Sequence, residues 1–182
     1  MSAPLVPAAR PLIGEEEIAA VAAVMRSGMI AQGPEVAAFE EEFARAMAPG
    51  ARAVAVNSGT SALHLGLLAA GIGPGDEVVV PSFTFAATAN AVAITGATPV
   101  FADIDLRTYT LAPASVQEAV TPRTRAIMPV HLYGHPAPMD QILAIAEANG
   151  LMVFEDAAQA HGASLHGRRV GCFGEFGVFS FY

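Results

Sequence analysis

Short apolar segments alternate with segments of helical spacing along most of this chain, and that alternation limits the fold more than any other feature. The apolar segments predict strands at residues 53–56, 77–80, 98–102, 126–130, 151–155 and 174–182. Between them, apolar spacing predicts helices at residues 58–70, 84–95, 113–120 and 139–149. Repeated strand–helix units are typical of an α/β fold with a mostly parallel sheet flanked by helices.

Two helices are predicted before this alternating region. Residues 14–28 begin with Gly14 and three glutamates, which favour the positive end of a helix, and close on a second glycine. Residues 34–47 begin with a proline, carry an apolar stripe and stop at Pro49-Gly50. The glutamate clusters at 15–17 and 40–42 are therefore interpreted as solvated helix faces and not as metal sites.

The composition excludes several classes of protein. The net charge is −8 without a basic run, so neither nucleic acid nor an anionic membrane is an expected partner. Residues 53–75 and 78–102 carry no Asp, Glu, Lys or Arg. Such stretches are compatible with either a membrane protein or a buried sheet. Polar and turn residues interrupt both stretches, and strands buried on two faces have the same composition, so we favour the sheet. Residues 1–12 contain no apolar signal core and Cys172 is the single cysteine, from which we expect a cytoplasmic protein without disulfides.

Residues 57–62 lie between a predicted strand and a predicted helix, where small residues expose backbone N–H groups to an anion. Gly59, Thr60 and Ser61 at this turn suit a phosphate, and capping of the helix by Ser58 or Thr60 is an equally good interpretation. The turn is not a nucleotide-binding P-loop, because the lysine of that motif is missing.

Three further segments place chemically useful side chains after predicted strands. Phe85 either stacks on a flat ligand ring or belongs to the core. Asp156 either pairs with a protonated ring nitrogen or caps a helix, and Gln159 and His161 are placed to hydrogen-bond the same ligand. Ser180 is either a phosphate ligand or an ordinary strand serine. No metal site is expected, since the histidines at 131 and 135 are separated by Gly134 and followed by Pro136, which prevent a regular helix.

Taken in order, six motifs give the chain a resemblance to a known family. They are residues 57–63 (Asn-Ser-Gly-Thr-Ser-Ala-Leu), 73–78 (Gly-Pro-Gly-Asp-Glu-Val), 81–85 (Pro-Ser-Phe-Thr-Phe), 129–134 (Pro-Val-His-Leu-Tyr-Gly), 155–162 (Glu-Asp-Ala-Ala-Gln-Ala-His-Gly) and 180–182 (Ser-Phe-Tyr). Each is weak alone, but together they resemble the DegT/DnrJ/EryC1/StrS family of pyridoxal-phosphate-dependent sugar aminotransferases. The resemblance implies the large domain of a fold-type-I enzyme, acting in the biosynthesis of polysaccharide or antibiotic sugars.

The resemblance also implies roles for individual residues. The cofactor is pyridoxal 5′-phosphate, Phe85 would stack on its ring, Asp156 would bind the ring nitrogen, and Gln159 would lie near the phenolic oxygen. The phosphate would be held by Gly59, Thr60, Ser61 and Ser180, whereas Gln32 and His161 would lie near the substrate. The implied substrates are glutamate or glutamine as amino donor and a nucleotide-linked keto sugar, and the implied assembly is a homodimer.

The chain contains no lysine, since all nine of its basic residues are arginine. Members of the family carry a catalytic lysine shortly after the Ser-Phe-Tyr stretch, where it binds the cofactor covalently and moves the substrate proton. The resemblance therefore places this lysine just beyond Tyr182, and no catalytic residue is expected within residues 1–182. We expect these residues to be the N-terminal segment and most of the large cofactor-binding domain, with the small C-terminal domain missing. Two alternatives stay open: a sugar dehydratase of the same family with histidine in place of the lysine, and a truncated, non-catalytic binding or regulatory protein.

Overall fold

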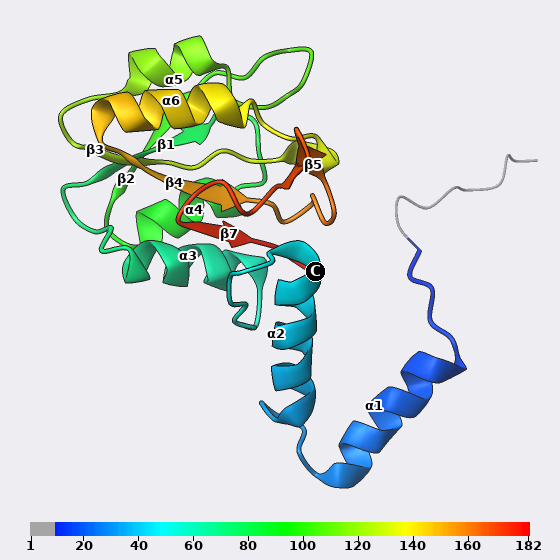
Figure 1. Cartoon of the computed structure of the whole chain (residues 1–182). Coiled ribbons are helices and arrows are strands. Elements are labelled where there is room, and N and C mark those ends of the chain that lie inside the picture. Colours follow the sequence, from blue (N-terminus) through cyan, green and yellow to red (C-terminus); the bar gives the residue numbers. More distant parts are fainter. Residues whose placement is uncertain (1–9) are drawn as a thin grey trace, which may run out of the picture.

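The computed structural model describes residues 10–182, and a parallel sheet of five strands forms its centre (Figure 1). In chain order the strands are β1 (Glu77–Pro81), β2 (Thr98–Ala102), β3 (Thr124–Ile127), β4 (Met152–Asp156) and β7 (Phe176–Val178), and their order in the sheet is β2-β1-β3-β4-β7. Every pairing between these neighbours is parallel. The predicted α/β fold is confirmed. A separate antiparallel pair, β5 (Ser164–Leu165) with β6 (Arg168–Arg169), lies between β4 and β7 in the chain.

Helices cover both faces of the sheet. The first layer consists of α3 (Gly59–Ala69) and α4 (Ala87–Ile94), and the second of α5 (Pro113–Ala119) and α6 (Met139–Asn149) (Figure 1). Because successive strand residues point to opposite faces, Val78 and Val80 of β1 join the core under α3 and α4, whereas Val79 joins the core under α5 and α6. The uncharged residues 78–102 include most of β1 and all of β2, whereas the uncharged residues 53–75 contain α3 and no strand. No helix of residues 10–182 is long and apolar enough to cross a membrane.

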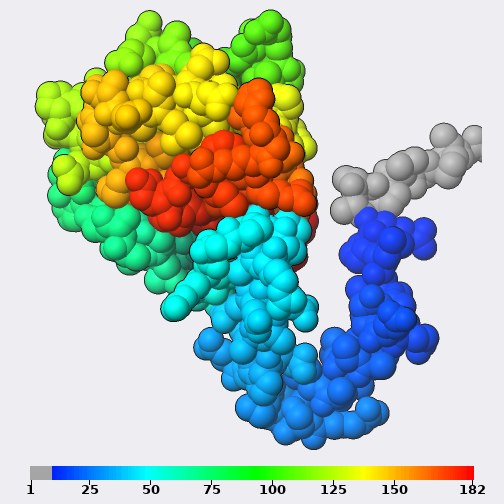
Figure 2. Space-filling view, in the orientation of Figure 1, coloured from blue at the N-terminus to red at the C-terminus, as the bar shows by residue number. Residues whose placement is uncertain are grey.

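The two N-terminal helices form an arm that projects from this body (Figures 1 and 2). Both α1 (Glu15–Ser27) and α2 (Pro34–Met47) are helical as predicted, and neither has a buried residue. The arm meets the body where Phe43 of α2 packs edge-on against Phe179 and Phe181, with ring centroids 5.2 and 5.6 Å apart. These rings join α2 to the segment that follows β7.

The predicted strand at residues 53–56 is wrong, because this segment is irregular. A strand needs a neighbour to pair its backbone groups, and none of the described strands lies beside it. The N–H of Ala55 instead donates to Glu40 Oε1 of α2 at 2.7 Å, and the side chain of Val54 is 77 % exposed.

The last predicted strand is correct in place but wrong in length. It was expected to run from Gly174 to Tyr182, whereas β7 covers three residues, because β4 ends at Asp156 and Val178 is the last residue opposite it. Residues 179–182, Tyr182 included, have no partner strand among the described elements and are irregular. The segment after β7 is therefore free to turn toward α2 and α3 instead of continuing the sheet.

Two other boundaries differ from the prediction by three residues. β3 ends at Ile127 instead of residue 130, and α4 begins at Ala87 instead of residue 84. The backbone after β1, β3 and β7 is therefore irregular, and two of the predicted site residues, Phe85 and Ser180, lie in these segments.

Candidate functional site

Most of the predicted site residues come from segments that leave the sheet at one end. Residues 82–88 follow β1, residues 157–161 follow β4, and Phe179 and Ser180 follow β7. Since the strands are parallel, these segments lie at the carboxyl end of the sheet, the usual position of a ligand in open α/β folds. The amino end of α3 reaches the same place, because Gly59 contacts Ser180.

Asp156 is the last residue of β4, and alternation along the strand decides where its side chain points. Phe154 lies in the core under α3 and α4, and Asp156, two residues later, points to the same face. There its Oδ2 accepts a hydrogen bond from Thr88 Oγ1 at 2.8 Å, and its Oδ1 accepts one from the N–H of Ala158 at 3.1 Å. The Asp156 side chain is thus held at a fixed orientation, and the residue is only 6 % exposed.

The charge of Asp156 needs a partner. Burial raises the pKa of Asp156 above its ordinary value, while the hydrogen bonds from Thr88 and Ala158 and the nearby His131 act in the opposite direction. A protonated ring nitrogen placed against Asp156 would supply the missing positive charge and stabilise the carboxylate. The geometry therefore fits a cationic heterocycle better than it fits helix capping alone.

In the turn at residues 57–62, named the phosphate turn below, the capping interpretation is confirmed for Ser58 and phosphate binding stays a prediction. Ser58 caps α3, since its Oγ accepts the N–H of Ser61 at 3.1 Å. Gly59 lies so close to Ser180 that a Cβ on Gly59 would be 3.0 Å from Ser180 Cβ and 3.1 Å from its Oγ. The first turn of α3, with Thr60 and Ser61, therefore faces a second hydroxyl group, an arrangement suited to a phosphate.

Phe85 follows β1, Gln159 and His161 follow β4, and none of the three is a core residue. Phe85 is 75 % exposed, so the alternative that it belongs to the core is wrong. Gln159 Oε1 accepts the N–H of Tyr133, at 3.1 Å, in the 3-10 turn η1 (Leu132–Gly134), which fixes the direction of the amide. His161 packs among the rings of Phe179 and Phe181, and this burial lowers its pKa, which favours the neutral imidazole.

Tyr182 marks the place after which the catalytic lysine is expected. Its N–H lies 3.3 Å from Ser180 Oγ, which puts this place next to the phosphate turn, but its side chain is fully exposed. The lysine expected beyond Tyr182 lies outside residues 1–182, and its position stays a prediction.

Gln32 is the predicted site residue that this chain does not bring to the others. It lies in the connection between α1 and α2, at the end of α2 away from the sheet (Figure 1). Its role near the substrate stays a prediction.

The sequence matches the DegT/DnrJ/EryC1/StrS aminotransferase family over residues 11–182. The chain belongs to this family. It is 51 % identical over 176 residues to the spore coat polysaccharide biosynthesis protein SpsC of Bacillus subtilis, covering 97 % of this chain and 45 % of that protein. It is 53 % identical over 167 residues to dTDP-3-amino-3,4,6-trideoxy-alpha-D-glucose transaminase of Streptomyces venezuelae, covering 92 % of this chain and 44 % of the relative.

Solved structures agree with the sequence matches. An aminotransferase from Psychrobacter cryohalolentis is 42 % identical with a TM-score of 0.92, over 98 % of this chain and 45 % of its own. A putative sugar aminotransferase from Streptococcus pneumoniae, in its PLP form, is 31 % identical with a TM-score of 0.91, over 97 % of this chain and 49 % of its own. The chain thus spans slightly less than half the length of these family members.

The residues of this aminotransferase family member fit pyridoxal phosphate, which carries a phosphate and a ring nitrogen. The turn at Gly59 and Ser180 offers hydroxyl and N–H donors for the phosphate, and Asp156 offers a fixed carboxylate for the nitrogen. Phe85 offers an exposed aromatic face. When bound, this cofactor supplies the electron sink for amino-group transfer.

Sequence reasoning missed the buried pair that supports Asp156 from behind. Glu155 points to the other face of β4 and receives a hydrogen bond from His131 Nε2 at 2.9 Å, and neither side chain is exposed. The N–H of His131 also donates to the carbonyl oxygen of Asp156, so the pair fixes the end of β4. The available signal was a carboxylate in an apolar strand with a histidine after the neighbouring strand.

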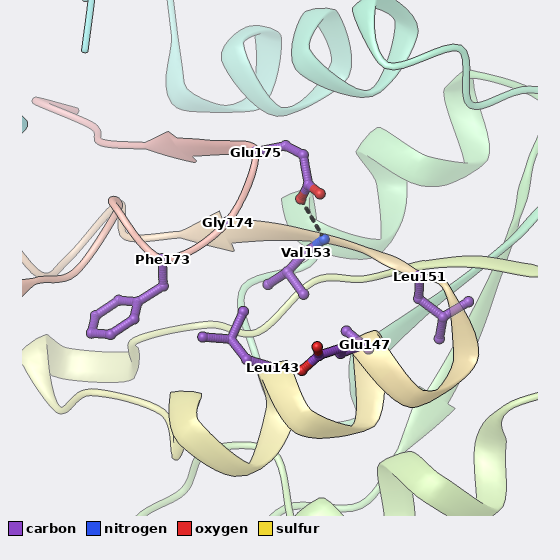
Figure 3. Close-up of a pocket in the computed structure, with 8 residues that line it drawn as sticks. Leu143, Glu147, Leu151, Val153, Phe173, Gly174 and Glu175 are labelled. Atoms are coloured by element: carbon purple, nitrogen blue, oxygen red, sulfur yellow. Dashed lines mark hydrogen bonds between the residues drawn. The ribbon is translucent and has the colours of Figure 1, made fainter. Parts of the chain in front are cut away.

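A shallow groove lies at the opposite end of β4 and is not part of this site (Figure 3). The segment around Gly174 forms one wall and α6 the other, with Glu175 Oε2 accepting the N–H of Val153 at 2.6 Å. Its lining comprises Leu143, Ala146, Glu147, Leu151, Val153, Phe173, Gly174 and Glu175. Because β4 runs away from the groove, no predicted site residue lines it.

Proposed function

We propose that this chain forms the cofactor-binding part of a pyridoxal-phosphate-dependent sugar aminotransferase. In this proposal the complete protein transfers the amino group of glutamate or glutamine to a nucleotide-linked keto sugar. The observation that carries it is the carboxylate of Asp156, buried and oriented at the carboxyl end of the sheet, where Gly59 also lies against Ser180. Membership of the aminotransferase family and the sugar-processing relatives support the chemistry.

Each site residue has a proposed task. Gly59, Thr60, Ser61 and Ser180 bind the phosphate, Asp156 binds the ring nitrogen, and Phe85 covers one face of the ring. Gln159, oriented by the N–H of Tyr133, directs its amide toward the phenolic oxygen. His161, neutral among aromatic rings, and Gln32 contact the substrate.

Residues 1–182 contain no lysine, so the covalent role requires a lysine from elsewhere in the complete protein. The relatives are about twice as long as the aligned region, which leaves room for it. We propose that it follows Tyr182 and lies near Ser180, at the carboxyl end of β7.

A second copy of the chain is the proposed partner. α1 exposes an apolar stripe in which Ile18, Val21 and Met25 are 54 %, 61 % and 68 % exposed. A stripe of this kind on a projecting helix is stabilised when another surface covers it. Sedimentation of the complete protein should show a dimer, and a monomer at micromolar concentration would contradict this part of the proposal.

Incubating the complete protein with pyridoxal phosphate, a nucleotide-linked keto sugar and ¹⁵N-labelled glutamate or glutamine tests the function. We expect the sugar to gain ¹⁵N, detected by mass spectrometry, and the Asp156→Asn variant to lose most of this transfer. Glu147→Gln, an exposed carboxylate on α6, is the matched control and should retain it. A protein that neither binds the cofactor nor transfers ¹⁵N would refute the proposal, and loss of oxygen from the sugar without ¹⁵N would favour the dehydratase.

A further inference from the structure

Two threonines lie between α4 and the carboxylate of Asp156. Thr88, in the first turn of α4, is fully buried, and its Oγ1 lies 2.8 Å from Asp156 Oδ2. Thr84 precedes the helix, and its Oγ1 lies 3.0 Å from that of Thr88. The three side chains thus form a continuous line from a half-buried hydroxyl to the buried carboxylate.

The proton positions along this line follow from the chemistry of the groups. A carboxylate only accepts hydrogen bonds, so the single hydroxyl proton of Thr88 points to Asp156. Thr88 must then accept from Thr84, and the chain runs in one direction, from Thr84 through Thr88 to Asp156. Hydrogen bonds in such a chain polarise one another, so the bond to Asp156 is stronger than that of an isolated threonine.

The two oxygens of Asp156 are held from different elements. Oδ2 is held by Thr88 from α4, and Oδ1 by the N–H of Ala158 in the segment after β4. With one donor on each oxygen the carboxylate cannot rotate freely. Removing the Thr88 hydroxyl would release Oδ2 and leave it buried without its side-chain donor.

We propose that Thr88 is a positioning residue, which orients Asp156 toward the cofactor's ring nitrogen, and that Thr84 in turn orients the Thr88 hydroxyl. This inference rests on the proposed function and adds two residues to the site. Neither residue touches the reacting atoms, so their effect must pass through the carboxylate. The effect should therefore depend on whether the ligand has a ring nitrogen.

The test compares two ligands by titration calorimetry with the complete protein freed of cofactor. One is pyridoxamine phosphate, which binds without a bond to lysine, and the other is its analogue with carbon in place of the ring nitrogen. Thr88→Val, which replaces the hydroxyl with a methyl group of similar size, should weaken pyridoxamine phosphate about tenfold. The affinity for the analogue should be unchanged, and Thr88→Ser should restore the tighter binding of pyridoxamine phosphate.

A buried threonine at the other end of α4 provides the matched control. Thr95 Oγ1 donates to the carbonyl oxygen of Val92 and does not contact Asp156. Thr95→Val should leave the ratio of the two affinities at the wild-type value, even if it lowers stability. An equal loss for both ligands in Thr88→Val would overturn the proposal and leave Thr88 a structural residue.

If Thr88→Val does not fold, Thr84→Val and Thr88→Ala test the proposal in its place. Thr84→Val lies outside α4 and removes only the donor to Thr88, so it should lower the preference for pyridoxamine phosphate over the analogue by a smaller factor. An unchanged preference in both Thr84→Val and Thr88→Ala would refute the inference. Failure of the wild-type protein to bind pyridoxamine phosphate would instead refute the proposed function.

Discussion

Among the buried side chains, we expect Glu155 to be the one whose replacement by a side chain of equal size destabilises the fold most. Its Oε1 accepts the N–H groups of Phe173 and Gly174 at 2.5 and 2.9 Å. Its Oε2 accepts the N–H of Gly171 at 2.7 Å and His131 Nε2 at 2.9 Å. Each carboxylate oxygen therefore accepts from two donors. Three of the four bonds join β4 to the turn that leads into β7, and the fourth joins β4 to the segment after β3.

Replacing Glu155 with glutamine puts an NH₂ group where one oxygen was. His131 cannot adapt by moving its proton, because its Nδ1 already accepts the N–H of Ala137 at 3.0 Å. Whichever of the two oxygen positions the NH₂ group takes, it would face the two donors that the oxygen had accepted. Two hydrogen bonds are therefore lost. Bonds to a charged group contribute about 1.5–3 kcal/mol each. A neutral amide is less costly to bury than a carboxylate and offsets part of this loss, so we expect Glu155→Gln to lower the free energy of unfolding by about 3–4 kcal/mol.

The assay is urea unfolding of the complete, cofactor-free protein at pH 7, followed by far-ultraviolet circular dichroism at equal protein concentrations. Glu147→Gln is the control, since this glutamate is exposed on α6, and it should change the free energy by less than about 0.5 kcal/mol. A loss below about 1 kcal/mol in Glu155→Gln would refute the reasoning. It would mean that the four donors find other partners when the carboxylate is removed.

Three further predictions follow from close contacts and from burial. Gly174→Ala should destabilise the protein strongly, because its Cβ would lie 2.0 Å from the carbonyl oxygen of Val153. Thermal unfolding measures the loss, and Gly73→Ala, whose Cβ has room, is the control variant. Gly59→Ala should weaken pyridoxamine phosphate in calorimetry by pushing Ser180 away from the phosphate turn; unchanged binding would show that Ser180 is not a phosphate ligand. The imidazole of His161 should titrate below 6.5 in NMR spectra of the cofactor-free protein, because burial lowers its pKa. A lowered pKa in the folded state contributes stability above pH 6.5 that is lost as the pH falls through the folded pKa. An NMR titration midpoint of His161 at or above 6.5 would contradict the lowered pKa.

The sequence predicted most of the fold because its elements are encoded locally. Apolar runs of strand length and glycines or prolines at helix ends marked nine of the described elements to within a few residues: α1 to α6, β1, β2 and β4. β3 and β7 were predicted with less accurate ends. The segment at 53–56 failed because strand formation depends on a neighbour, which no local pattern reveals, and the predicted extension of β7 to Tyr182 failed for the same reason.

The candidate site was only partly encoded in the same way. Asp156 and the turn at Gly59 could be identified because each directly follows an apolar segment, and the order of motifs supported them. The residues that hold the two carboxylates could not be identified from the sequence. Thr88 lies 68 residues from Asp156 in the chain, and His131 lies 24 residues from Glu155. Both contacts arise only when parallel strands place their carboxyl ends together.

The sequence by itself therefore determined the class of fold, the family and the residue types available to bind a phosphate and a ring nitrogen. The tertiary structure decided how the two adjacent carboxylates are oriented and which groups hold each of them. The period of two along β4 turns Asp156 toward α3 and α4, where a cofactor is proposed to bind, and turns Glu155 into the opposite face, where four donors hold it. Those donors come from chain segments far from Glu155 in the sequence or from the turn before β7, so only the packed sheet brings them together.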